Sequence, residues 1–179
     1  IYISDASGIG GATTINDLVF TRNSFGTVDY SIHTAKSLPI NYLKIMDNQF
    51  DGYSRAAILF NGPIEQFQIA NNYFELQGID ASGSSPATVA TNNSGGTTTC
   101  HGAIIMHPTT NNTVGADGQI TGNFFINCNK SGIISSSANK SLIIRDNEVA
   151  NATSGAYLVD FTNAIGISSG PLSYTYTCL

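Results

Sequence analysis

The sequence predicts an all-β solenoid of about five to six coils, with about 24 residues in each coil. Three observations support this prediction: a repeated Asn-x-Phe motif, apolar residues spaced two apart before each repeat, and a composition unlike that of a helical protein. Asn, Ser, Thr and Gly make up 73 of the 179 residues, whereas Asp, Glu, Lys and Arg reach only 11%. This composition argues against a helical bundle, and the length suits a single domain with one continuous core.

The repeat is an Asn followed two residues later by an aromatic or apolar residue. It occurs as Asn-x-Phe at Asn23, Asn48, Asn72 and Asn123, and as a variant at Asn147, where Val149 replaces the Phe. The intervals between successive Asn residues are 25, 24, 51 and 24 residues, so the long interval holds either two periods or one period with an insertion. A fixed period of this length is typical of solenoids, in which each repeat buries its apolar side against the next.

Each repeat also holds two apolar segments. The first places apolar residues five and three positions before the Asn in most repeats, a spacing of two that is typical of a β-strand. Its members are Leu18/Phe20, Leu43/Ile45, Phe67/Ile69, Gly118/Ile120 and Leu142/Ile144. The second follows the Asn, at residues 57–60, 103–106, 132–134 and 156–159. We therefore expect at least two short strands in each repeat, joined by polar turns.

Parallel, in-register stacking of these strands predicts two inner columns. One is a stack of Phe25, Phe50, Phe74, Phe125 and Val149, and the other is a ladder of the five Asn side chains. An Asn has two uses at such a turn. It tolerates left-handed backbone angles, and its amide can form hydrogen bonds with the next coil.

These features resemble the right-handed parallel β-helix proteins of the pectate-lyase-like superfold, which includes bacteriophage tailspikes and many extracellular enzymes that degrade polysaccharides. The resemblance covers roughly residues 15 to 165 and rests on the coil length, the Asn ladder and the aromatic stack. The Asn-Thr-Asp, Asp-Asp, Gly-His-Gly and Arg-Ile-Lys motifs of polygalacturonase-type hydrolases do not occur, and Cys100-His101-Gly102 is only a near match. The chain also has no Trp, a residue that often stacks on sugars in such grooves.

The chain divides into three predicted parts. We expect an N-terminal lead-in or cap at residues 1–14, the β-helix at residues 15–165, and a C-terminal strand or cap at residues 166–179. Within the helix, residues 77–100 are nearly uncharged and rich in turn-forming residues, which predicts a long surface loop inserted in the third coil. This loop is either a tolerated excursion or a wall over one face of the helix.

Outward-facing carboxylates supply the first candidate site. Because strand side chains alternate, the positions one and three after each ladder Asn face outward. Asp51 and Glu75 then lie on adjacent coils, about 5 Å apart, a separation that suits retaining glycoside hydrolysis. Tyr73 lies beside them, in position to stack on a sugar, and Arg55 shares a coil with Asp51. The alternative interpretation is two solvated carboxylates at an exposed turn.

A second candidate column follows the second strand of each repeat. Alignment of the apolar segments places Asn61, His107, Ser136 and Asp160 in this column. His107 and Asp160 would lie two coils apart, roughly 10 Å, which suits contacts to a sugar but not a direct hydrogen bond. The alternative is a row of polar turn residues of the kind that every coil needs.

Several classes of function are excluded or disfavoured. The net charge is −5, and the seven Lys and Arg residues are not clustered, so nucleic acid is not an expected partner. No apolar run is long enough to suggest membrane insertion. Because there are three cysteines, Cys100, Cys128 and Cys178, at least one cannot form a disulfide within the chain, and the sequence does not define their oxidation state. Their spacing does not match a metal-binding motif. We expect no metal site and no cofactor.

The resemblance implies a phage tailspike or tail-fibre domain that recognises, or recognises and cleaves, a bacterial surface polysaccharide. Such a domain is expected to be extracellular or part of the virion, to form a homotrimer, and to belong to a larger assembly. Two alternatives remain: a secreted polysaccharide lyase or hydrolase that acts as a monomer, and a non-catalytic adhesin or structural spacer.

Overall fold

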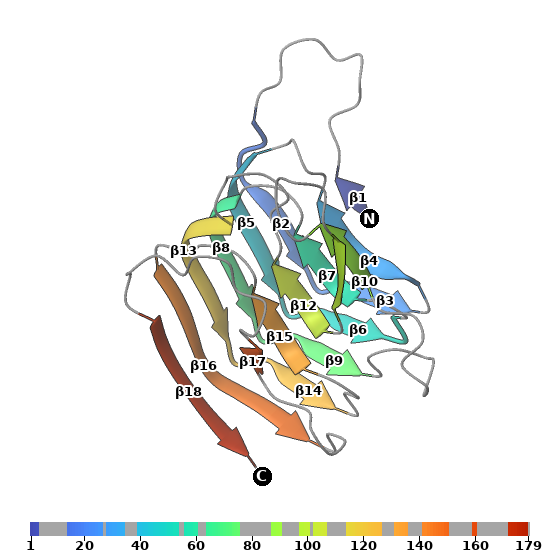
Figure 1. Cartoon of the computed structure of the whole chain (residues 1–179), viewed down its shortest axis with the longest axis vertical. Helices are drawn as coiled ribbons and strands as arrows, with labels where there is room; N and C mark the ends of the chain where they lie inside the picture. The colour runs from blue at the N-terminus through green and yellow to red at the C-terminus, as the bar shows by residue number, and fades with distance from the viewer. Residues whose placement is uncertain are drawn as a thin grey trace.

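The computed structural model shows an all-β chain in which parallel strands from successive repeats lie side by side (Figure 1). No helix occurs in the part of the chain that it describes. That part comprises residues 1–3, 14–26, 28–34, 39–53, 56–60, 64–75, 87–90, 97–100, 102–106, 114–126, 131–135, 141–150, 159–160 and 172–178. This arrangement of parallel strands is compatible with the predicted β-helix.

Three rows of strands build the stack, and the strands of each row follow one another in sequence order. The first row is β1 (Tyr2–Ile3), β4 (Tyr30–Thr34), β7 (Ala56–Phe60), β12 (Gly102–Met106), β15 (Ser131–Ser135) and β17 (Val159–Asp160). The second row is β2 (Leu18–Thr21), β5 (Ile40–Met46), β8 (Ile64–Ala70), β13 (Val114–Thr121), β16 (Ser141–Ala150) and β18 (Leu172–Cys178). The third row is β3 (Ser24–Gly26), β6 (Gln49–Asp51), β9 (Tyr73–Glu75) and β14 (Phe124–Ile126), and it continues over the last residues of β16 and β18. One strand from each row, taken in sequence order, is called a rung here; β1, β2 and β3 form the first rung.

A sharp bend separates the second row from the third. The residues at the bend are Arg22, Asp47, Asn71, Gly122 and Asp146, which directly precede the five ladder Asn residues and have φ between 55° and 65°. β16 and β18 each pass through the bend as one continuous strand. The left-handed conformation is therefore taken by the residue before each Asn. Our expectation that the Asn would take it was wrong, because the Asn must direct its side chain inward.

The Asn ladder itself is confirmed. Asn48, Asn72, Asn123 and Asn147 are buried, and each Asn donates through its backbone N–H and its Nδ2 to the Oδ1 of the next Asn where a next Asn exists. Asn72 shows the full pattern, with distances of 2.9 and 3.0 Å to Asn123 Oδ1 and a further bond of 2.9 Å from its Nδ2 to the carbonyl of Ile45. The ladder satisfies the polar groups that the bend would otherwise leave buried without partners.

The aromatic stack is also confirmed. The rings of Phe25, Phe50, Phe74 and Phe125 follow one another at centroid distances of 4.8 Å, with their planes within 7° of parallel. Val149 continues this inner column in register with Phe125. Phe50, Phe74 and Phe125 have no exposed surface, so the stack forms one side of the hydrophobic core.

Gly118 interrupts an inner column that is otherwise apolar, and packing explains the exception. The column contains Leu18, Leu43, Phe67, Gly118 and Leu142 in register. A Cβ at Gly118 would lie 2.3 Å from the ring of Phe67, so that ring occupies the space of the missing side chain. Phe67 in turn packs edge to face against Phe60, at a centroid distance of 5.8 Å. One large residue therefore fills two positions of the column.

The long interval of 51 residues is one period with an insertion. β8 pairs directly with β13, and β9 pairs directly with β14, so Asn72 and Asn123 lie on neighbouring rungs. Part of the insertion is ordered as an antiparallel pair, β10 (Ala87–Ala90) and β11 (Thr97–Cys100). The insertion therefore contains a strand pair rather than loop alone. At the chain ends, β1 pairs with β4 and β18 pairs with β16, so both predicted terminal segments contribute strands.

Candidate functional site

The outer face of the third row carries the predicted carboxylate pair. β6 and β9 are parallel neighbours, and Asp51 is in register with Glu75. Asp51 is exposed and Glu75 is partly buried. The residue directly before each of them, Phe50 or Phe74, faces the core. Parallel neighbours in register stand about 5 Å apart. The structure thus brings the two carboxylates together on one outward face.

Tyr73 is tied to this pair through its hydroxyl group. The phenol donates a hydrogen bond of 3.0 Å to Oε2 of Glu75. The pKa of Tyr73 is raised above its usual value, first by partial burial and then by the hydrogen bond and by the negative charges of Glu75 and Asp51. The neutral phenol is therefore the favoured form, and it fixes the orientation of the Glu75 carboxylate.

The ring of Tyr73 also has an aromatic neighbour on the next rung. Phe124, its register partner on β14, stacks on it at a centroid distance of 5.6 Å and an angle of 25°. One face of Tyr73 is therefore covered by protein. Gln49, its register partner on β6, lies on the opposite side of the ring.

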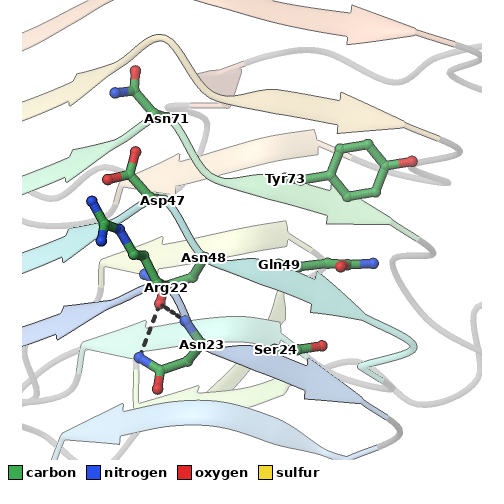
Figure 2. A pocket seen from close by; sticks show the side chains of 8 residues that line it. All are labelled: Arg22, Asn23, Ser24, Asp47, Asn48, Gln49, Asn71 and Tyr73. Carbon is green, nitrogen blue, oxygen red and sulfur yellow. Dashed lines mark hydrogen bonds between the residues drawn. The ribbon is translucent and has the colours of Figure 1, made fainter.

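A shallow concavity of about 510 Å³ lies beside the carboxylate pair, over the first three rungs. Two parallel columns of side chains line it (Figure 2). The bend residues Arg22, Asp47 and Asn71 form one column, and the outward residues Ser24, Gln49 and Tyr73 form the other. Asn23 and Asn48 form the floor between the columns, where the ladder hydrogen bonds run. We call this concavity the bend groove.

The bend groove is polar, and most of its side chains have no protein partner. In the part of the chain that the structure describes, no ion pair or side-chain hydrogen bond involves the side chains of Arg22, Asp47, Asn71 or Gln49. Arg22 contributes only its backbone N–H, which donates to the carbonyl of Met46. Guanidinium, amide and carboxylate groups all exchange hydrogen bonds with hydroxyl groups. The groove can therefore bind a ligand with many hydroxyls.

Sequence analysis missed the bend groove as a site, although a signal was present. The sequence pattern did not single out the bend residues as a group, because their exposure depends on the left-handed turn that precedes each ladder Asn. Once that turn is known, the position before every Asn of the repeat is an exposed one. Arg22, Asp47 and Asn71 could have been selected on that basis.

The structure describes only part of the second predicted column. Arg55, Asn61 and His107 lie outside the described residues. Asp160 is described as part of β17, where it is in register with Ile134. Ile134 lies two positions before Ser136, so the alignment of Asp160 with Ser136 was wrong. The strand pairing, rather than the apolar pattern, decides this register, because apolar residues occupy both faces of these segments.

The predicted absence of a metal site stays a prediction. Asp47 and Asp146 both precede a ladder Asn, but they lie on rungs that two other rungs separate. Asp146 lies 3.7 Å from Arg145 in an exposed ion pair. Among the described residues, no three His, Cys, Asp or Glu side chains gather as metal ligands do.

No helix with the length and apolarity of a membrane span occurs among the described residues. Comparison of the chain with protein-family models, with curated proteins and with solved structures finds no match. The site must therefore be interpreted from its own geometry.

Proposed function

We propose that the chain is a right-handed parallel β-helix domain of a bacteriophage tailspike or tail fibre, and that it binds a bacterial surface polysaccharide in the bend groove. In this proposal the domain is extracellular or virion-borne and works as a homotrimer within a larger assembly. The parallel rows, the Asn ladder and the aromatic stack support the fold. No cofactor is required for binding.

One observation carries the binding proposal: polar side chains recur on successive rungs along one groove, and among the described residues most of them have no protein partner. Arg22, Asp47 and Asn71 occupy the same bend position on three rungs, and Ser24, Gln49 and Tyr73 occupy the same outward position. The rungs repeat at the 4.8 Å spacing of the ring stack. A polymer of hydroxyl-rich units can therefore form similar contacts at each rung.

Glycine substitutions test this proposal without straining the backbone. Gly122 occupies the bend position on the fourth rung, so Arg22→Gly and Asn71→Gly each remove a side chain from a position where glycine already occurs. We expect each variant to bind purified bacterial surface polysaccharides about tenfold more weakly, because each loses charged or amide hydrogen bonds.

The matched control is Asp146→Gly, which changes the same bend position outside the groove. We expect this variant to bind polysaccharide as tightly as the unmodified chain in titration calorimetry. A double Arg22→Gly/Asn71→Gly variant that keeps full affinity for a polysaccharide bound by the parent would refute the groove as the binding site.

Glycoside hydrolysis is a second candidate function, favoured by the register of Asp51 with Glu75 and by the hydrogen bond from Tyr73. In a retaining mechanism one carboxylate attacks the anomeric carbon, and the other protonates the leaving oxygen. We expect Asp51→Asn and Glu75→Gln each to abolish release of reducing ends from a bound polysaccharide while leaving binding and the melting temperature nearly unchanged. Cleavage that survives both substitutions would rule out this pair.

Two further measurements separate the alternatives. A monomer in light scattering would favour a secreted lyase or hydrolase over the trimeric spike. Polysaccharide binding without any release of reducing ends would favour a non-catalytic adhesin or receptor-binding fibre. Absence of both binding and cleavage would leave a structural spacer.

A further inference from the structure

The second and third rungs place three carboxylates along the bend groove. Asp47 lines the groove at the bend. Asp51 and Glu75 lie at its edge, two residues beyond Gln49 and Tyr73 on the same strands. Two residues of a strand span about 7 Å, so both carboxylates are close to the groove. Each of these rungs has a neighbouring rung on both sides, because β5 lies between β2 and β8, and β8 lies between β5 and β13.

The carboxylate of Glu75 is held against the lining of the groove. Tyr73 lines the groove, and its hydroxyl donates a hydrogen bond of 3.0 Å to Oε2 of Glu75. The pKa of Tyr73 is raised, first by desolvation and then by this hydrogen bond and by the negative charges of Glu75 and Asp51. The charges of both carboxylates therefore act on a side chain that lines the groove.

Among the described residues, one cation lines the groove, and it is Arg22 on the first rung. Figure 2 shows its side chain extending along the bend toward Asp47 on the second rung. One positive charge therefore faces one negative charge at the bend. The charges of Asp51 and Glu75 remain, so three carboxylates and one guanidinium leave the groove and its edge with an excess of negative charge.

The other Lys and Arg side chains of the described part are engaged elsewhere. Lys44 places its Nζ over the ring of Tyr42, 5.2 Å from the ring centroid and farther from the bend along β5. Arg145 lies 3.7 Å from Asp146 on the fifth rung. The whole chain is also acidic, with a net charge of −5. The negative charge of the groove is therefore not offset by its described surroundings.

We propose that the bend groove binds uncharged polysaccharides in preference to acidic ones. This inference rests on the proposed binding of polysaccharide in the groove, and it specifies the chemical class of the polymer. The hydroxyl groups of a neutral sugar donate hydrogen bonds to the carboxylates of Asp47 and Glu75. A sugar carboxylate can only accept hydrogen bonds, and it is repelled by these like charges.

Arg22 does not reverse this preference for a polymer. A carboxylate bound beside Arg22 on the first rung gains from the guanidinium charge. In a polymer of uronic acids, however, every sugar carries a carboxylate. The sugars that follow along the groove then bring their carboxylates to the second and third rungs, where Asp47, Asp51 and Glu75 lie. The polymer as a whole is therefore bound less tightly than its neutral counterpart.

Carboxyl reduction supplies matched ligands for the test. Acidic bacterial surface polysaccharides that contain uronic acids are each compared, by titration calorimetry, with the same polymer after its carboxylates have been reduced to primary alcohols. The reduction leaves the order and the linkage of the sugars unchanged. We expect the reduced form to bind about tenfold more tightly at an ionic strength of about 0.1 M. This ratio should fall at about 1 M salt, because salt screens exposed charges.

Charge-neutralising variants test whether the named carboxylates cause the preference. Asp47→Asn fits the backbone, since Asn71 occupies the bend position on the next rung with nearly the same φ. Glu75→Gln changes the charge and keeps the shape of the side chain. We expect each variant to lower the ratio from about tenfold to about threefold, because the acidic form binds more tightly once a like charge is removed.

The matched control is Asp146→Asn. It makes the same substitution at the same bend position, but outside the groove, and it changes the net charge of the chain by the same amount as Asp47→Asn. We expect it to keep the ratio of the parent chain. A ratio that both variants change equally would mean that the overall charge of the chain causes the preference, which overturns the inference.

Two other outcomes separate this inference from the proposed function. An acidic polymer that the parent chain binds at least as tightly as the reduced form would overturn the preference and leave polysaccharide binding intact. Failure of every polymer to bind in either form would refute polysaccharide binding itself, and the inference with it.

Discussion

The inner and outer sides of the third row differ in how strictly the residues repeat. On the inner side, a ladder Asn is followed two positions later by Phe, as in Asn48/Phe50 and Asn72/Phe74, and Val149 replaces Phe only after the fifth Asn. On the outer side the same strands present a different residue on each rung, with Ser24, Gln49, Tyr73 and Phe124 in register. Inner residues must match the residues above and below them, whereas outer residues face solvent. Stability therefore depends on the inner side, and the residues of the outer side are free to vary.

The largest loss of stability is expected from a substitution in the aromatic stack. Phe74→Ala should lower the free energy of unfolding by about 3 to 5 kcal/mol, because the ring loses contacts with both Phe50 and Phe125 and leaves a cavity. Gln49→Ala, on the outer side of the neighbouring strand, should change it by no more than about 0.5 kcal/mol. Urea unfolding measures both. Similar losses for the two variants would mean that the inner side has no special part in stability.

The Asn ladder gives the next largest effect. Asn72→Leu should cost roughly 2 to 3 kcal/mol, because the buried backbone N–H of Asn48 and the carbonyl of Ile45 each lose a partner. Asn23→Leu, the same change at the exposed end of the ladder, should cost about 1 kcal/mol or less. Thermal and urea unfolding of the two variants should show this difference. Equal costs would contradict the importance of burial for the ladder.

A substitution at Gly118, in the second row, should have a smaller effect on stability. Gly118→Ala should cost about 1 to 3 kcal/mol, because its Cβ overlaps the ring of Phe67. Combining it with Phe67→Leu should recover part of the loss, since Leu43 and Leu142 occupy the same column on other rungs. The double variant should therefore be more stable than the sum of the two single changes predicts. Simple additivity in a double-mutant cycle would show that the two sites are not coupled.

The smallest expected effect concerns the outer side and depends on pH. The pKa of Tyr73 is raised, so the folded state holds the phenolic proton more tightly than the unfolded state. The resulting stability is fully present below about pH 10, the usual pKa of tyrosine, and is lost as the pH rises through the raised value. Absorbance titration of a Glu75→Gln variant should show a lower pKa for Tyr73 than in the parent chain. An unchanged titration would mean that the hydrogen bond to Glu75 does not form in solution.

Repetition made much of the fold predictable. The Asn and Phe positions, the apolar residues before them and the pairing of Asp51 with Glu75 all follow from one rule, because in-register stacking places equivalent residues of neighbouring repeats together. Prediction failed where a residue broke the pattern. Asp160 was misaligned, since the apolar run Ala156–Val159 shows no alternation in the sequence from which a register could be chosen. The groove column of Arg22, Asp47 and Asn71 was missed, since its exposure follows from a backbone angle rather than from side-chain type.

The sequence by itself determined which residues face the core along the Asn ladder and the aromatic stack. Identical residues repeated at a fixed interval stack on one another, so that the Asn amides form hydrogen bonds with each other and the Phe rings pack together. Tertiary structure decided the rest. It showed that the ring of Phe67 fills the space at Gly118, that Phe124 covers one face of Tyr73, and that no described residue donates to Oδ1 of Asn23. These features depend on contacts between side chains of different rungs, and no local pattern in the chain records such contacts.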